Sequence, residues 1–358
     1  MNYRPNKVMF TNFLKIGLSG LSERIGFKRF LYLGKREGPK KLPMTPFWEM
    51  VRKEITDHIR NWRFIILFAL IVLTCAGTLY TALVNTHKTF SASGAEDAFF
   101  FLHLFSSSNG TLPAFFVFIG FLGPLFGISL GFDAINSEQN RGTLSRILAQ
   151  PIPRDYVLTA KFVAGIAVIS VLFYVLSFLV IGAGLFALGI PPTAEEFMRI
   201  MVYTLLSIVY VGFWLSISIF FSVRFRQPAT SALGCIAVWL FFTVFYPLII
   251  KMVASGVAPT QNASPSALYR YGQLKFYMAQ VMPNELFSEI TTTILSPSIR
   301  SLGPLTMEQM MGAIPGNLPL GQSLLLVWPQ FTGLVAITLL FFLFSYVLFM
   351  KREIRSRA

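Results

Sequence analysis

Residues 132–161 read FDAINSEQNRGTLSRILAQPIPRDYVLTAK and form a long polar insert between two hydrophobic runs. The apolar run on each side is about 20 residues or longer, which is the length that a helix needs to cross the hydrocarbon of a bilayer. Charged side chains are costly inside that hydrocarbon, so the insert must lie outside it. The stretch therefore predicts two membrane-spanning helices joined by a polar loop.

Composition extends this prediction to the whole chain. Of its 358 residues, 54% are hydrophobic and 13% are charged, and the mean hydropathy is +0.62. A soluble domain carries about twice that share of charge. The length alone would allow two soluble domains, but hydrophobic runs fill most of it. We therefore expect one membrane domain of the all-α polytopic class.

Six stretches are long and apolar enough to span a bilayer as helices. None of them contains Asp, Glu, Lys or His. They are residues 64–84, 112–132, 162–188, 200–223, 229–250 and 324–350. Because six is an even number, both ends of the chain are expected on the same side of the membrane.

The basic residues indicate which side that is. Residues 1–63, 133–161, 222–228 and 351–358 hold 24 of the 30 Lys and Arg residues, and these segments alternate with loops that carry little positive charge. Loops rich in Lys and Arg stay in the cytoplasm, so we expect cytoplasmic N- and C-termini. The same bias accounts for the net charge of +14 without a nucleic-acid partner.

Two segments precede the first span. Residues 1–43 mix aromatic and basic side chains, which suits either a segment on anionic lipid headgroups or an unattached basic tail. Charges interrupt every apolar run before residue 64, so no signal peptide is expected. Residues 44–63 carry apolar side chains at intervals of three and four, which predicts an amphipathic interfacial helix that turns into the first span at Arg63. Residues 351–358 form a basic C-terminal tail.

On the outer side, residues 251–323 form an unusually long loop. It holds apolar, helix-like pieces at residues 268–282 and 286–295, which are too short to span and are bounded by prolines. We expect re-entrant or interfacial helices over the outer mouth of the protein. The methionines of this loop are expected to pack rather than to bind copper, since no Cys or His lies near them.

Metal and nucleotide chemistry finds little support. Two histidines and two carboxylates share the first outer loop, but their spacing matches no common metal motif, and we expect a solvated loop. They are His87, Glu96, Asp97 and His103. Both cysteines fall inside hydrophobic runs, where we expect them to pack. The chain has no G-x-x-x-x-G-K-[ST], G-x-S-x-G or H-E-x-x-H motif, so we predict no metal, no cofactor and no catalytic residue.

Within the polar insert, the residue pattern predicts one short helix. Gly142 permits a turn, Thr143 can cap a helix that follows, and Pro151 and Pro153 stop it after about two turns. Its apolar side chains could fill a groove on a partner, while its arginines could pair with partner carboxylates. These side chains are Leu144, Ile147, Leu148, Arg141, Arg146 and Arg154. An ordinary basic loop is the alternative.

The insert also carries residues in a recognisable order. They are Asp133, Glu138, Gly142-Thr143-Leu144, Leu148, Pro151-Ile152-Pro153-Arg154 and Lys161. This order resembles the loop between the second and third spans of ABC-2 type transporter permeases. The six spans, the amphipathic helix and the broken region before the last span are also similar to that family. The resemblance covers residues 44–350, with the transmembrane domain at 64–350. Residues 1–43 and the long outer loop depart from the pattern and leave the substrate open.

The resemblance implies the non-enzymatic membrane subunit of an ATP-binding cassette transporter. It implies a second permease subunit, expected to make a homodimer in contact with membrane lipid, and two copies of a separate ATPase that binds ATP and Mg. The permeases would carry a substrate, with export as the family tendency, across a prokaryotic cytoplasmic membrane. Insert 133–161 would be the coupling loop. Its expected ATPase contacts are Asp133, Glu138, Arg141, Gly142, Thr143, Leu144, Arg146, Ile147, Leu148, Pro151 and Arg154.

Other functions share some of these features. A non-transporting membrane subunit could instead transmit the ATP-driven movements of the ATPase to an extracytoplasmic partner. An ion-coupled secondary carrier would need ionisable groups in its spans, and the six spans have none. Several aromatic side chains are expected either to line a path for an amphipathic substrate or to pack against lipid. They are Phe115, Phe116, Phe118, Phe121, Phe213 and Trp214.

Overall fold

The computed structural model describes residues 46–93, 99–106, 113–259, 264–304 and 316–351, with the backbone alone at 85–93 and 188. These residues form helices without any strand, and six helical stretches have the length and hydropathy to cross a membrane. The all-α membrane class and the six spans are therefore confirmed. Our expectations for residues 1–43, for the His87 side chain, for Glu96 and Asp97, and for the tail after Lys351 lie outside what it describes. The expected solvated loop at residues 85–111 is wrong in part, because one helix (Trp62–Ser93) runs through His87 and a second (Phe100–Ser106) is mostly buried.

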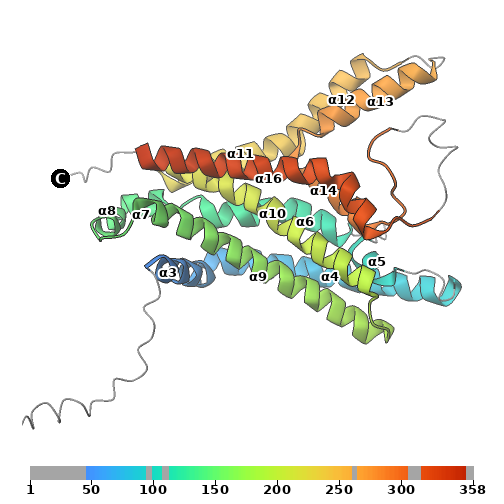
Figure 1. The fold of residues 1–358 in the computed structure, drawn as a ribbon, viewed down its shortest axis with the longest axis horizontal. Helices are drawn as coiled ribbons and strands as arrows, with labels where there is room; N and C mark the ends of the chain where they lie inside the picture. The colour runs from blue at the N-terminus through green and yellow to red at the C-terminus, as the bar shows by residue number, and fades with distance from the viewer. Residues whose placement is uncertain (1–45, 94–98, 107–112, 260–263, 305–315, 352–358) are drawn as a thin grey trace, which may run out of the picture. The chain divides into compact units, whose positions relative to one another are not determined.

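The spanning helices run side by side, except that the last part of the fifth span, residues 246–256, leaves the bundle (Figure 1). In chain order they are α4 (Trp62–Ser93), α6 (Phe115–Gly131), α9 (Arg154–Leu188), α10 (Ala194–Arg224), α11 (Pro228–Leu240) with η2 (Phe241–Phe245) and α12 (Tyr246–Gly256), and α16 (Leu320–Lys351). The η2 segment is one π-helical stretch inside the fifth span. Several helices begin before the apolar runs that predicted them, because their first turns stand outside the hydrocarbon and tolerate charge.

Helix α10 is the centre of the bundle and packs against α6, α9 and α16. In its most apolar stretch of 18 residues, 83% is buried within the chain. The corresponding share is 17% in the first span and 17% in the fifth. Its contact with α6 is close because Gly127 has no side chain there. A Cβ at Gly127 would lie 2.6 Å from the carbonyl oxygen of Val211, so any larger residue would force the backbones apart.

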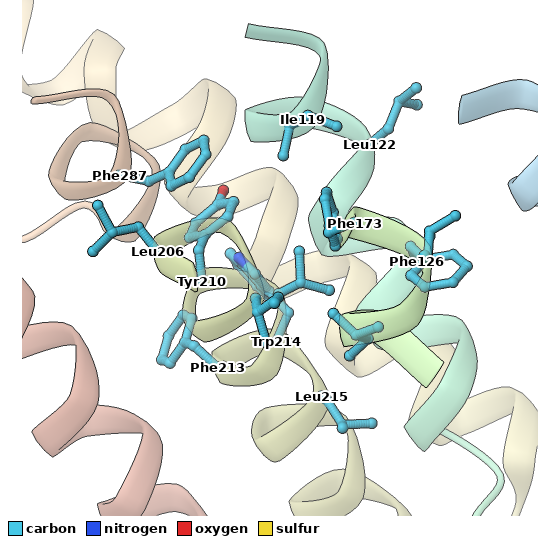
Figure 2. Packing of buried hydrophobic residues seen from close by; sticks show 14 of the residues in the cluster. Ile119, Leu122, Phe126, Phe173, Leu206, Tyr210, Phe213, Trp214, Leu215 and Phe287 are labelled. Atoms are coloured by element: carbon cyan, nitrogen blue, oxygen red, sulfur yellow. The ribbon is translucent and has the colours of Figure 1, made fainter. Parts of the chain in front are cut away.

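Across the same contact, polar side chains of α10 donate to carbonyl groups of α6. The Tyr210 hydroxyl donates to the Gly120 carbonyl at 2.8 Å, and the Ser218 hydroxyl donates to the Ile128 carbonyl at 2.8 Å. Figure 2 shows the aromatic side chains Tyr210, Phe213 and Trp214 that α10 contributes to this core. Such bonds satisfy polar groups that water cannot reach.

The amphipathic segment is α3 (Pro46–Arg60), which packs against α9 and buries Val51. The chain turns into α4 at Asn61, two residues before the predicted turn at Arg63. The Asn61 side chain accepts from the Arg63 backbone amide at 3.1 Å and so occupies one of the unpaired donors at the start of α4. We call the end of the bundle that carries α3 and the polar insert the basic end (Figure 1).

Short helices lie toward the other end of the bundle, which we call the outer end. They are α5 (Phe100–Ser106), α13 (Pro265–Ala279) and α14 (Pro283–Leu295). The two last helices match the apolar pieces predicted inside the long loop. Prolines at their first turns explain where both begin, since Pro lacks the amide hydrogen that the first turn leaves unpaired anyway. The free thiols of Cys75 and Cys235 are buried, as expected for packing residues.

Candidate functional site

The polar insert folds into two short helices joined by a glycine turn. α7 (Asn136–Asn140) and α8 (Thr143–Leu148) lie on either side of Gly142, whose φ of 69° is in the left-handed region that glycine adopts most easily. The predicted turn and short helix are thus present. The predicted cap at Thr143 is wrong, because Gly142 occupies the N-cap position. The Thr143 hydroxyl instead donates to the Glu138 carbonyl at 3.2 Å.

An ion cluster joins the insert to two other helices. The Lys161 ammonium of α9 lies 2.9 Å from a carboxylate oxygen of Glu54 on α3 and 2.9 Å from one of Glu138 on α7. The Lys161 side chain is 5% exposed, so these carboxylates replace its water. Lys53 lies on the solvent side, 3.1 Å from Glu54 and 3.6 Å from Glu138. The cluster holds α3, α7 and α9 together.

A second ion pair holds the start of the insert against the first span. The Arg63 guanidinium donates to the Asp133 carboxylate at 2.7 Å and lies over the Phe132 ring, 4.9 Å from its centroid. Arg63 stands in the first turn of α4, and Asp133 follows the end of α6. Two of the predicted contact residues, Asp133 and Glu138, therefore have partners within this chain.

The apolar residues of the insert also face this chain. Leu144 is 2% exposed and belongs to the main hydrophobic core, and Ile147 and Leu148 are half-buried against that core. The sequence suggested that these side chains fill a groove on a partner. Leu144 is already covered, so the helix α8 is anchored to its own bundle by that residue.

Other residues of the insert face solvent. The side chains of Arg141 and Arg146 are exposed, as are Gly142, Thr143 and Pro151, whereas Arg154 is half-buried. The outward surface of α7 and α8 is therefore basic, while the inward surface is apolar and ion-paired.

A groove with a volume of about 860 Å³ opens between α3 and the insert. Its walls carry both signs of charge, with the cations Arg60, Arg141 and Arg146 toward solvent and the ion cluster at its base. His58 also lines it, and burial lowers the pKa of His58 despite the attraction of Glu54. The groove can receive a partner that presents carboxylates and polar groups.

The ion cluster perturbs the titration of Glu54. Burial alone would raise the pKa of this carboxyl, but the attraction and hydrogen bonds of Lys161 and Lys53 outweigh burial, and the pKa lies below its ordinary value. Glu54 therefore remains charged at neutral pH, so its carboxylate continues to attract Lys161 and Lys53.

The outer end has its own buried charge. Arg199 is fully buried near the start of α10, and its guanidinium donates to the Ile294 carbonyl at 2.9 Å, to Glu195 at 2.9 Å and to the Ser323 hydroxyl at 3.4 Å. It also donates to the Leu318 carbonyl. The last turn of α14 and the start of α16 are thus tied to α10. No sequence pattern indicated this role, because the Ile294 and Ser323 partners lie 95 and 124 residues away.

Helix α14 lies deep beside the spans. The Phe287 ring stacks on the Tyr210 ring with centroids 4.3 Å apart and planes 12° apart, and the two are neighbours in Figure 2. Tyr210 stands about 24 Å along α10 from Ala194, at about 1.5 Å per residue. The other end of α14 is held by Arg199 near the start of α10. α14 therefore extends alongside the outer half of α10.

This placement brings two carboxyls alongside the spans. Glu285 and Glu289 both lie on α14, one turn apart. Burial raises the pKa of Glu285, and burial together with repulsion from Glu285 raises the pKa of Glu289 to about 7. The six apolar runs predicted to span contain no carboxyl group, whereas α14, a helix outside them, carries these two. Only the packing of α14 could reveal this, since its residues are too few to span.

The aromatic residues singled out in the sequence divide into two groups. Phe115, Phe213 and Trp214 are buried in the core, and Phe118 is half-buried against it. Phe116 and Phe121 line a pocket of about 240 Å³ between α6, η2 and α14, together with Glu285. Two of the aromatic rings named in the sequence therefore face a pocket, while the α10 aromatics are enclosed.

No group of three His, Cys, Asp or Glu side chains is arranged to hold a metal ion among the residues that the structure describes. His103 is exposed on α5. Met282 is buried at the start of α14, where it packs as the sequence suggested.

Comparisons with known proteins agree on one family. A family model described as "ABC-2 family transporter protein" matches residues 48–354. The chain is similar to the "Probable ABC transporter permease protein NosY" of Stutzerimonas stutzeri, with 26% identity over 217 residues, or 58% of this chain and 70% of the relative. It is similar to the protein of the same name from Pseudomonas aeruginosa, with 27% identity over 217 residues, or 59% and 71% of the two chains.

Proposed function

The chain belongs to the ABC-2 family of transporters, and from this membership we propose that it is one of two identical permease subunits driven by two copies of a separate ABC ATPase. It is a multi-pass membrane protein and an ABC transporter permease. In the proposed assembly the basic end faces the cytoplasm, the ATPases bind ATP and Mg there, and the permeases export a substrate.

The ion cluster around Lys161 is the observation that supports coupling. It joins the insert to α3 and to α9, and Leu144 anchors α8 to the core. A force on the outward surface of α7 and α8 would therefore move the insert together with a spanning helix. A loop without internal contacts would absorb the same force by bending.

The exposed arginines are the proposed contacts with the ATPase. Arg141 and Arg146 stand on the outward surface of the insert and line the groove beside α3. A planar guanidinium pairs well with carboxylates of a partner. Asp133, Glu138 and Leu144 would act indirectly, because they hold the insert in position from within.

The pairing of two permeases is supported by unequal burial. Only 17% of the first and fifth spans and 22% of the sixth are covered by this chain, against 83% of the fourth. Apolar side chains such as Leu73, Leu248 and Leu325 are exposed on them. A second copy could cover part of this surface, with lipid covering the rest.

Coupling can be tested by co-expressing the chain with a phosphate-loop ABC ATPase from the same genome. The double variant Arg141→Glu and Arg146→Glu should reduce co-purified ATPase at least tenfold and leave the melting temperature unchanged, because both side chains are exposed. Arg270→Glu, an exposed arginine on α13, is the matched control and should retain the ATPase. Equal co-purification of both variants would refute the proposed contact surface.

Transport itself needs a separate measurement. In vesicles that contain the chain and its ATPase, substrate movement should require ATP and should stop with Arg141→Glu and Arg146→Glu. Movement that continues without ATP and follows a proton gradient would identify a secondary carrier instead. ATP turnover that responds to an extracytoplasmic partner, without any transport, would identify a mechanical transmitter.

A further inference from the structure

The turn between α10 and α11 forms one wall of a pocket at the basic end. α10 ends at Arg224, because Phe225 is extended with φ −95° and ψ 143°, and α11 begins at Pro228. The last turn of α16 forms the other wall. We call this space the α10–α16 pocket. Its volume of about 490 Å³ falls within the range of about 300–1,000 Å³ that small-molecule sites occupy. It is lined by Val223, Arg224, Phe225, Arg226, Leu348 and Lys351.

Half of this lining is cationic, and no acidic residue belongs to it. Arg224 is the last residue of α10, Arg226 lies in the turn that follows, and Lys351 ends α16. All three side chains are exposed. Charges of one sign around one space repel each other, and an anion between them relieves that repulsion. The α10–α16 pocket therefore favours a negatively charged ligand.

The elements around the pocket supply no carboxylate to it within the described residues. α11 has no acidic residue, and the single charged residue of α16 is Lys351. Glu195 and Glu196 stand at the opposite end of α10. Glu138, on α7 of the insert, is bound by Lys161. The described part of the chain therefore leaves the counter-charge to another molecule.

The other half of the lining is apolar. Leu348 is half-buried on α16, and the Phe225 ring stacks on the Phe221 ring with centroids 5.5 Å apart and planes 9° apart. Phe344, one turn before Leu348 on the same face of α16, is 51% exposed. An inorganic anion gains nothing from such walls, whereas a phospholipid joins a phosphate to hydrocarbon chains that bury apolar surface.

The position of the pocket suits a lipid headgroup. α10 and α16 both have the length and hydropathy of membrane spans, and the last residues of both line the pocket. Figure 1 shows that α16 ends at the basic end. Basic pockets between the ends of spanning helices bind the headgroups of anionic lipids. A guanidinium can also donate to two phosphate oxygens at once.

We propose that the α10–α16 pocket binds an anionic membrane phospholipid. Arg224, Arg226 and Lys351 hold its phosphate, and Leu348 and Phe225 contact the first carbons of its acyl chains. The three cations alone would also fit a free phosphate. The apolar walls favour the lipid, because only the lipid brings hydrocarbon to them.

The wall of the pocket is also bonded to the insert. The Ser222 hydroxyl, directly before this wall, accepts from the Ile135 backbone amide at 2.9 Å. The Arg226 carbonyl, within the wall, accepts from the Asn140 side-chain amide at 3.1 Å. Both ends of α7 are therefore attached to the segment that lines the pocket, and a lipid that fixes this segment restricts α7 as well. Its effect on coupling rests on the proposed function, whereas lipid binding does not.

The test measures lipid binding by the purified full-length chain in a neutral detergent. Native mass spectrometry counts bound molecules of dioleoyl phosphatidylglycerol, which is anionic, and of dioleoyl phosphatidylethanolamine, which has no net charge. The natural chain should bind phosphatidylglycerol at least tenfold more tightly. The pocket variant, with Arg224→Gln, Arg226→Gln and Lys351→Gln, should lose this preference. It should keep its melting temperature, because all three side chains are exposed.

A matched variant separates this pocket from the general positive charge of the basic end. Arg52→Gln, Arg141→Gln and Arg146→Gln remove the same charge from exposed positions of α3 and the insert, and this variant should keep the preference. Equal losses in the two triple variants would overturn the proposed site. Displacement of phosphatidylglycerol by inorganic phosphate at the same concentration would overturn it in favour of a free phosphate. Unchanged lipid binding in the pocket variant, with loss of the co-purified ABC ATPase, would show a protein contact instead.

Hydrogen exchange followed by mass spectrometry tests the link to the insert. Phosphatidylglycerol should slow the exchange of the α7 amides in the natural chain and should have no such effect in the pocket variant. The amides of α14, at the outer end, are the internal reference and should exchange at the same rate with and without lipid. Bound phosphatidylglycerol that leaves α7 exchange unchanged would overturn the link between the pocket and the insert.

Discussion

Lys161 and Glu138 lie 2.9 Å apart, from nitrogen to carboxylate oxygen, although 23 residues separate them in the chain. Glu54 binds the same ammonium from 107 residues away. The polar insert is therefore fixed to the interfacial helix and to the third span by one enclosed cation.

Replacing Lys161 should destabilise the protein strongly. Lys161→Met would leave Glu54 and Glu138 enclosed without their shared cation, and such a loss costs about 3–5 kcal/mol. Denaturant unfolding in detergent measures the change. Arg270→Met, which removes an exposed cation, should cost less than about 0.5 kcal/mol. Adding Glu54→Gln and Glu138→Gln to Lys161→Met should recover part of the loss, and a full additive loss would argue against the cluster.

The cluster should also make stability sensitive to acid. Because the pKa of Glu54 is lower in the folded protein than its ordinary value, the stabilisation is present above about pH 4.5 and is lost as the pH falls below it. Melting temperatures between pH 7 and pH 3.5 should therefore fall more steeply for the natural chain than for Glu54→Gln. Parallel curves for the two proteins would contradict this assignment.

Gly127 should tolerate no side chain. A Cβ there would lie 2.6 Å from the Val211 carbonyl oxygen, so Gly127→Ala must separate α6 from α10 and should cost about 1–3 kcal/mol. Gly182→Ala is the matched control on α9, because nothing lies within 4 Å of a Cβ at that position. The control should be neutral or slightly stabilising, since Ala favours helices over Gly by about 1 kcal/mol. Thermal melting compares the stability of the two variants, and equal melting temperatures would contradict the close contact at Gly127.

Arg199 should hold the outer end together. Arg199→Met would remove the donors that bind the Ile294 carbonyl and Glu195, so the last turn of α14 should exchange its amide hydrogens faster. Hydrogen exchange followed by mass spectrometry measures this locally. The amides of α8, at the basic end, serve as the internal reference and should be unchanged. Unaltered exchange in α14 would show that other contacts hold this helix.

The sequence predicted many of the local features of the insert but not its orientation. Gly142 gave the turn and the prolines gave the end of α8, because both act through backbone geometry that needs no distant partner. The local sequence could not predict that the side chains of Glu138 and Leu144 point inward. It depends on a cation and on a core built from residues that lie far away along the chain.

The sequence by itself determined the membrane class, the six spans and the expected side of the basic loops, because hydropathy, length and charge are properties of each segment alone. The tertiary structure decided which residues of the insert face inward around Lys161 and which, as Arg141 and Arg146, face solvent. It also decided that α14 brings Glu285 and Glu289 beside the spans. The physical reason is that a buried ion pair or a stacked ring requires a partner from another helix, and helix packing alone selects that partner.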